Sequence, residues 1–162
     1  MIIPDDNKIE FHPYDSTVPD KFKKIKIQIQ TALGKNAKIE LHGAAGLKIS
    51  GQKELDVYIP VSLVAFDDCV NKIKLVFGNP RSSYFPKRVR FEGHIKDTKA
   101  EIFVINQDCD QWTNYLQFEN FLLANPVFLK KYEKLKQSCI GLSTREYYRR
   151  KIEFINKILS LS

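Results

Sequence analysis

The chain has 162 residues, of which 43% are hydrophobic and 28% are charged, and its formal net charge is +7. A chain of this size buries one core without disulfide or metal support, and its composition excludes collagen-like, disordered and disulfide-rich classes. No stretch reaches the roughly 18 uncharged apolar residues of a membrane helix, and residues 1–6 lack the features of a secretory signal. Three cysteines without a CxxC pair favour reduced thiols. We therefore expect a single cytosolic domain over residues 1–162, with no membrane partner.

The positive charge is concentrated near the C-terminus. Residues 130–162 contain nine Lys and Arg but three Glu, whereas the preceding residues contain seventeen basic and sixteen acidic side chains. One interpretation is a solvated helix surface with internal ion pairs. The other is a surface that attracts an anionic partner, which would be a nucleotide, a nucleic acid or an acidic protein.

The first half of the chain predicts helices that alternate with strands. In chain order these are a helix over 19–33, a strand over 37–41, a strand over 55–59 and a helix over 63–77. Ser16 or Thr17 is expected to cap the first helix, and Gly78 to end the second. The Gly-rich run at 42–46 between the two strands is predicted to be a turn.

The second half predicts a hairpin followed by helices. A loop over 79–86 precedes strands at 88–91 and 100–105, and helices follow over 112–124, 126–137 and 144–160. Ser143 and Glu146 have the spacing of a capping box at the start of the last helix. We expect an α+β fold, with a small mixed or antiparallel sheet in residues 13–107, helices packed on it, and a helical part at 111–161.

Several kinds of active site are excluded by the motifs. The three histidines, His12, His42 and His94, lack metal-ligand spacing, so no zinc site is predicted. A G-x-S-x-G nucleophile turn, a Walker loop and a G-x-G-x-x-G fingerprint are also missing. What remains is a strand, a Gly-containing turn and a second strand with one carboxylate, Asp56.

Around this region the sequence resembles the GrpB family of the nucleotidyltransferase superfamily, whose fold is shared by DNA polymerase beta. The resemblance covers about residues 12–160. The residues that carry it are Pro13-Tyr14-Asp15, Pro19 and Phe22; Ile39-Glu40, Gly43, Lys53 and Asp56; and Trp112, Leu116, Phe118, Asn125-Pro126, Tyr132, Leu135-Lys136, Tyr148, Lys151 and Phe154-Ile155. No single piece is specific, but their order and spacing together are.

The resemblance implies Mg²⁺-dependent transfer of a nucleotidyl group from a nucleoside triphosphate to an unknown acceptor. Carboxylates on strands would hold two Mg²⁺ ions that stabilise the attacking and leaving oxygens. Asp56 is the implied catalytic residue and metal ligand, with Glu101 as its best partner and Asp97 as the next candidate. The predicted nucleotide-contacting residues are Gly43, Ala44, Ala45, Lys53, Arg88, Arg90 and Lys151.

Three departures from the family pattern leave two hypotheses open. Ala44 replaces the serine of the phosphate turn, the segment from Gly43 to Asp56 is about one residue short, and Tyr58, two residues after Asp56, is a poor Mg²⁺ ligand. The protein is either a nucleotidyltransferase with a partly degenerate active site or a non-catalytic module that keeps the fold and binds a nucleotide, a nucleic acid or a protein. Asp56 also has a structural alternative, an ion pair with Lys53 or an arginine.

Overall fold

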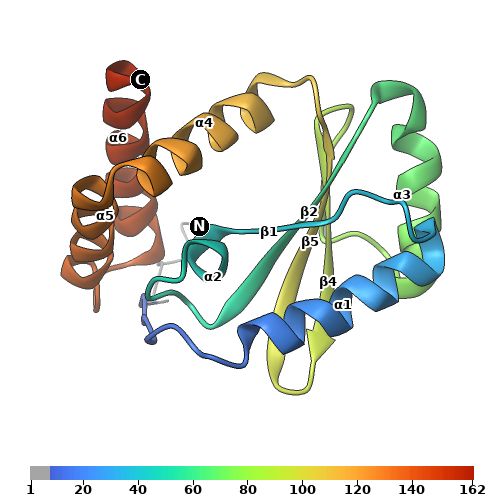
Figure 1. Cartoon of the computed structure of the whole chain (residues 1–162), viewed down its shortest axis with the longest axis horizontal. Helices are drawn as coiled ribbons and strands as arrows, with labels where there is room; N and C mark the ends of the chain where they lie inside the picture. The colour runs from blue at the N-terminus through green and yellow to red at the C-terminus, as the bar shows by residue number, and fades with distance from the viewer. Residues whose placement is uncertain (1–7) are drawn as a thin grey trace, which may run out of the picture.

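A computed structural model describes residues 8–162; residues 1–6, on which the prediction about a secretory signal rests, lie outside this range. Within it the chain forms a mixed α+β fold of five strands and six helices, which confirms the predicted fold class (Figure 1). In chain order the elements are α1 (Val18–Leu33), β1 (Glu40–His42), α2 (Gly43–Leu47), β2 (Glu54–Val61), α3 (Leu63–Phe77), β3 (Ser82–Tyr84), β4 (Arg88–Ile95), β5 (Thr98–Asn106), α4 (Asp110–Ala124), α5 (Pro126–Ser138) and α6 (Thr144–Leu161).

The five strands form one mixed sheet in the order β1-β2-β5-β4-β3. Strands β2 and β5 lie side by side in the centre and are parallel, whereas the other neighbouring pairs are antiparallel. The β2–β5 register places Asp56 opposite Glu101. The two candidate carboxylates are therefore neighbours on adjacent central strands.

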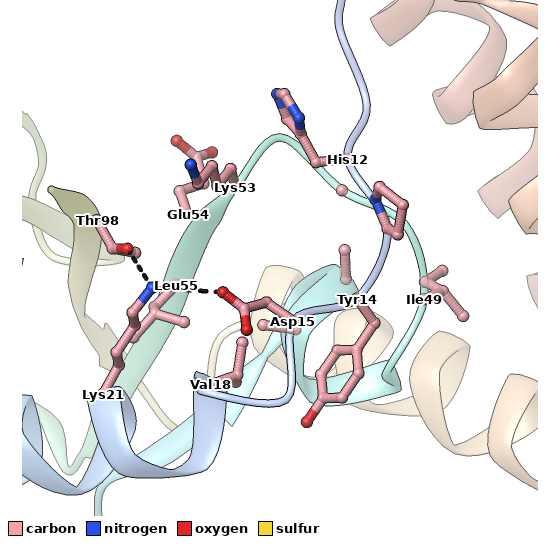
Figure 2. A pocket seen from close by; sticks show the side chains of 14 residues that line it. His12, Tyr14, Asp15, Val18, Lys21, Ile49, Lys53, Glu54, Leu55 and Thr98 are labelled. Atoms are coloured by element: carbon pink, nitrogen blue, oxygen red, sulfur yellow. Dashed lines mark hydrogen bonds and ion pairs between the residues drawn. The ribbon is translucent and has the colours of Figure 1, made fainter.

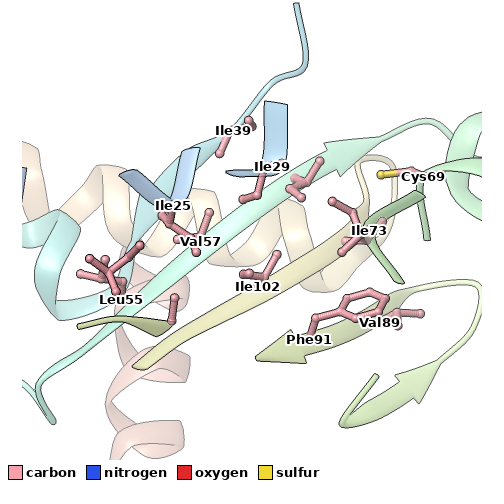
Figure 3. Packing of buried hydrophobic residues seen from close by; sticks show 14 of the residues in the cluster. Ile25, Ile29, Ile39, Leu55, Val57, Cys69, Ile73, Val89, Phe91 and Ile102 are labelled. Atoms are coloured by element: carbon pink, nitrogen blue, oxygen red, sulfur yellow. The ribbon is translucent and has the colours of Figure 1, made fainter. Parts of the chain in front are cut away.

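One face of the sheet packs against α1 and α3. Alternate residues of β2, β4 and β5 point to this face, because successive side chains of a strand point to opposite sides. With Ile25 and Ile29 of α1 and Ile73 of α3 they form the main apolar core, shown in Figure 3. The strand residues in this core include Leu55, Val57, Ile59, Val89, Phe91, Ala100, Ile102 and Val104.

The other face of the sheet meets the helical part of the chain. Trp112 of α4 packs on Tyr58, Phe103 and Ile105. Helices α4, α5 and α6 pack on one another through a second core that includes Phe118, Leu122 and Ile158, and Figure 1 shows them on the opposite side of the sheet from α1 and α3. None of the helices in residues 8–162 has the length and apolarity needed to cross a lipid bilayer.

The structure corrects three local predictions. The first strand is Glu40–His42 instead of 37–41, and the predicted turn at 42–46 is the short helix α2. The predicted loop at 79–86 contains strand β3, which pairs with β4 at the edge of the sheet. Both missed elements are short and Gly-, Ser- or Pro-rich, so their local sequence favours turns and their structure depends on tertiary contacts.

Helix capping also differs in part from the sequence prediction. Thr17 holds the N-cap position of α1 but makes no cap bond with its side chain; its N–H donates instead to Asp15 Oδ1 at 2.8 Å. At α6 the Ser143 half of the predicted capping box forms, because the Ser143 hydroxyl accepts the N–H of Glu146 at 3.1 Å, whereas the Glu146 carboxylate pairs with Arg149 and Arg150. Ser62 caps α3 in the same way by accepting the N–H of Ala65.

Candidate functional site

Asp56 points away from the main core. Its neighbours Leu55 and Val57 face α1 and α3, so Asp56 faces the helical part of the chain. There it lines a polar pocket, which we call the Asp56 pocket, between β2, α2 and the helices α4–α6. The cavity measures about 40 Å³, which is room for a few water molecules or one oxyanion group at a time. The residues around it are Phe11, Gly43, Ala44, Leu47, Gln52, Glu54, Asp56, Tyr115, Phe118, Glu119, Tyr132, Lys136, Tyr147 and Lys151.

Two lysines reach this pocket from different helices. Lys136 of α5 is only 4% exposed, lies 4.7 Å above the ring centre of Tyr132, and donates a long hydrogen bond of 3.4 Å to the Ser50 carbonyl. Lys151 of α6 lies 5.9 Å from the ring centre of Tyr147. A buried ammonium normally pairs with an acid or a dense set of acceptors. Lys136 thus places its ammonium group beside the cavity, where it can donate further hydrogen bonds to an anion.

Burial in the pocket disfavours the charged forms of both Asp56 and Lys136. Burial raises the pKa of Asp56 to about 7, with Glu54 and Glu101 adding to the rise and Lys151 and Lys136 opposing it. Burial likewise lowers the pKa of Lys136 to about 7, helped by the like charge of Lys151. Both groups therefore exchange protons near neutral pH, where a bound ligand can shift either one.

Glu119 and His42 fix one wall of the pocket. Glu119, 5% exposed, accepts a hydrogen bond from the Gly43 N–H at 3.2 Å and contacts His42 Nδ1 at 3.0 Å. Burial disfavours the His42 cation, but the hydrogen bond and charge of Glu119 outweigh it and raise the pKa of His42. These contacts hold the start of α2 against α4.

Gly43 allows the turn before α2 to approach Asp56. Its φ of 68° lies in the left-handed region, and a Cβ added there would collide with Asp56 Oδ2. We predict that Gly43→Ala destabilises the protein by at least about 2 kcal/mol, from left-handed strain plus displacement of the carboxylate. Urea unfolding measures the loss. Gly34→Ala is a matched control, because Gly34 also has positive φ but no atom within 4 Å of the added Cβ; an equal loss in both variants would contradict close packing on Asp56.

Glu101 is occupied by cations from its own sheet. Its two carboxylate oxygens pair with Arg90 and Lys99, each at 2.9 Å, and Lys99 also pairs with Glu54 at 3.4 Å. Among residues 8–162, no three His, Cys, Asp or Glu side chains gather closely enough to hold a metal ion. The donor set therefore does not suit a two-metal site, since the second carboxylate is neutralised by two basic groups.

The other predicted nucleotide-contacting residues divide among three places. Gly43, Ala44 and Lys151 line the Asp56 pocket together with Asp56. Arg88 is instead stacked between the rings of Tyr84 and Phe103, and Arg90 pairs with Glu101.

Ala45 and Lys53 line a second, mostly apolar cavity on the other side of α2, to which Ala44 also contributes. Figure 2 shows this second cavity, with Lys21 beside its rim donating to Thr98 Oγ1 at 2.8 Å and paired with Asp15. Lys53 therefore lines a different cavity from Asp56.

The main residues that sequence reasoning missed are Glu119 and Lys136 as site residues. A signal existed for Lys136: α5 and α6 carry the same Tyr-x-x-x-Lys spacing, at Tyr132 and Lys136 and again at Tyr147 and Lys151. Residues four apart lie on one helix face, so each amine is placed beside a ring. Glu119 lies four residues after Tyr115 in α4. A carboxylate on the buried face of a helix was the signal that could have identified Glu119.

The fold and the pocket define an α+β protein with a sheet-borne carboxylate facing two lysines. The GrpB protein family matches residues 8–161, so the chain belongs to the GrpB family. It is 26% identical over 149 residues to a UPF0157 protein of Vibrio cholerae, covering 90% of this chain and 78% of that one. It is 25% identical over 154 residues to the glutamate-rich protein GrpB of Alkalihalophilus pseudofirmus, covering 86% and 87%.

A solved structure has the same fold. The crystal structure of the conserved protein GrpB from Enterococcus faecalis superposes on this chain with a TM-score of 0.73 and 18% sequence identity. The superposition covers 93% of this chain and 95% of the E. faecalis chain.

Proposed function

We propose that this GrpB protein has the fold of the nucleotidyltransferase superfamily and binds a nucleotide through a phosphate group seated in the Asp56 pocket. The observation that carries the proposal is the convergence of Lys136 and Lys151 with Asp56 on one cavity. Lysine ammonium groups are common phosphate ligands, and a dianion between two of them relieves their mutual repulsion. The cavity admits an oxyanion group but not a whole nucleotide, so the nucleoside would lie at its mouth.

The order of the elements supports the superfamily placement. A Gly-containing turn, here Gly43 at the start of α2, precedes the strand that carries Asp56, and the turn packs directly on that carboxylate. The parallel neighbour β5 carries Glu101 at the matching register position.

Binding without two-metal chemistry is the function that this geometry supports best. Mg²⁺-dependent nucleotidyl transfer requires at least two carboxylates free to share metal ions. Glu101 already neutralises Arg90 and Lys99, and Tyr58 is stacked on Phe103 with ring centres 4.5 Å apart. Asp56 is left as the single carboxylate of the predicted pair that faces the pocket.

Calorimetric titration of the full chain with ATP, GTP, CTP and UTP, with and without Mg²⁺, tests the proposal. We expect at least one nucleotide to bind in the absence of Mg²⁺, and Lys151→Ala to weaken it by about tenfold, the loss of one charge-assisted contact. Lys157→Ala on the same helix is the matched control because Lys157 is exposed and does not line the pocket.

The same titration separates the alternatives. Failure of all four nucleotides to bind overturns the proposal, and so does equal binding by wild type and Lys151→Ala. Binding that requires Mg²⁺ and is lost in Asp56→Asn would instead favour the transferase, for which release of pyrophosphate is then the measurement.

A further inference from the structure

A row of stacked side chains crosses the sheet on the face opposite the main core. The Arg88 guanidinium carbon lies 5.5 Å from the ring centre of Tyr84 and 5.3 Å from that of Phe103. Phe103 stacks on Tyr58, which in turn stacks on Trp112 and Tyr115 of α4. Helix α4 thus covers one end of the row, and the other end terminates at Tyr84 on the edge strand β3.

Tyr84, at the open end of the row, presents its ring to solvent. Phe85 follows it and is also exposed, although its ring meets Phe66 of α3 edge-on with ring centres 5.8 Å apart. Tyr84 is 62% exposed and Phe85 61% exposed. Their backbone is held in place, because the Lys87 N–H donates to the Tyr84 carbonyl and the Asn106 N–H donates to the Lys87 carbonyl, both at 2.8 Å. Large exposed aromatics on a hydrogen-bonded turn form a prepared stacking surface with little conformational freedom to lose on binding.

The segment that carries these rings is positively charged. Residues 79–91 contain four basic side chains and no Asp or Glu. Arg81 and Arg90 are paired with Glu92 and Glu101, respectively. Lys87 is exposed next to the rings, and the Arg88 guanidinium lies on ring faces. The two cations closest to the aromatic rings are therefore available to an anion.

We propose that the β3–β4 turn, residues 84–88, binds single-stranded nucleic acid, with bases stacked on Tyr84 and Phe85 and phosphates contacted by Lys87 and Arg88. Alternating aromatic and basic groups are the recognition chemistry of single strands, because every base has a π-face and every linkage a phosphate. A duplex hides its base faces, and an acidic peptide would use the cations but leave the rings without a partner. This surface lies on the sheet edge at β3 and does not depend on a phosphate bound in the Asp56 pocket.

Fluorescence polarisation with labelled oligo-U and oligo-dT of about 12 nucleotides, at about 50 mM salt, tests the proposal on the full chain. Tyr84→Ala and Phe85→Ala are each expected to weaken binding by about tenfold, the usual loss for one stacked base. Tyr84→Phe should bind like wild type and Tyr84→Leu like Tyr84→Ala, because stacking needs a ring and not merely an apolar side chain. Lys87→Gln should lower the slope of log affinity against log salt by about 0.7, which corresponds to the loss of one phosphate contact on a single strand.

Controls distinguish this surface from the basic helical part. Lys130→Gln removes an exposed lysine of α5, and Leu75→Ala removes an exposed apolar side chain of α3; both should bind like wild type. Absence of binding, binding unchanged in Tyr84→Ala with Phe85→Ala, or tighter binding of a duplex than of a single strand overturns the proposal. Loss in Lys130→Gln alone would assign the contact to α5 and also overturn it.

Discussion

Replacing Lys136 by methionine is expected to abolish anion binding in the Asp56 pocket and, at the same time, to raise the melting temperature. Methionine is one atom shorter than lysine, but it is also unbranched and can pack on Tyr132, and it has no charge. The pKa of Lys136 falls from 10.5 to about 7 on folding, so the charged amine destabilises the folded state at every pH below 10.5, with the full cost below about 7. Each pKa unit is worth about 1.4 kcal/mol.

If half of that cost is recovered, the free energy of unfolding rises by about 2 kcal/mol and the melting temperature by roughly 5 °C. Thermal unfolding followed by circular dichroism at about pH 6.5 measures the shift, and calorimetry with sulfate or nucleotide measures binding. Lys134→Met, two residues away on the exposed side of α5, is the control and should change neither. A lower melting temperature in Lys136→Met would show that Lys136 is a structural ion-pair partner and not a ligand-binding group.

The other buried charged groups of the pocket differ in how well they are partnered. Asp56 and Lys136 each occupy a buried environment that disfavours the charged form, and Lys136 makes only a long hydrogen bond to the Ser50 carbonyl, whereas the buried Glu119 carboxylate accepts the Gly43 N–H and contacts His42. Proteins retain such groups where binding or chemistry requires them, because replacing them with apolar side chains is usually stabilising. We therefore place the bound ligand in the space between Asp56 and the two lysines.

The sequence predicted the elements whose local signals agree with one another. Helix α3 is the clearest example, since apolar spacing and the Gly78 stop both indicate 63–77, and the structure has Leu63–Phe77. Helix α2 had no such agreement: Gly43 and Gly46 favour a turn, and the helix is held by the burial of Leu47 in the helical core. Strand β3 is an edge strand of three residues and has only one pairing neighbour.

The sequence indicated Asp56 on the sheet and Lys151 on the last helix as site residues, but not Lys136 or Glu119. Asp56 was identifiable because a carboxylate in an apolar strand needs a partner or a function. Lys136 is far from Asp56 along the chain, and nothing in the local sequence indicates that α5 places this lysine beside β2. The sequence predicted Glu101 on a later strand, and the structure puts that strand next to β2 with Glu101 opposite Asp56. The pairing of Glu101 with Arg90 and Lys99 depends on register, which the sequence alone does not specify.

Affinity for sulfate is expected to fall as the pH rises through 7. Sulfate is the suitable probe because it keeps its double negative charge over this range, whereas phosphate titrates. Below pH 7 Asp56 is neutral and Lys136 carries a positive charge. Above pH 7 Asp56 carries a negative charge and Lys136 is neutral, so the pocket becomes more negative by two charge units. The charged groups that act on these two are Glu54, Glu101 and Lys151 for Asp56, and Lys151, Glu119 and Glu133 for Lys136.

Since each proton taken up on binding changes the affinity by a factor of about ten per pH unit, the dissociation constant should rise at least tenfold from about pH 6 to pH 8. Asp56→Asn removes one of the two titrating groups. The slope of log affinity against pH should therefore become shallower by the equivalent of about one proton, and binding at pH 8 should be stronger than in wild type. A sulfate affinity that is flat between these pH values, or the same slope in wild type and Asp56→Asn, would contradict an anion site in which Asp56 and Lys136 exchange protons. Because deprotonation of Asp56 and deprotonation of Lys136 both weaken anion binding, the protein should bind its anion with net uptake of protons, which calorimetry in buffers of different ionisation enthalpy measures directly.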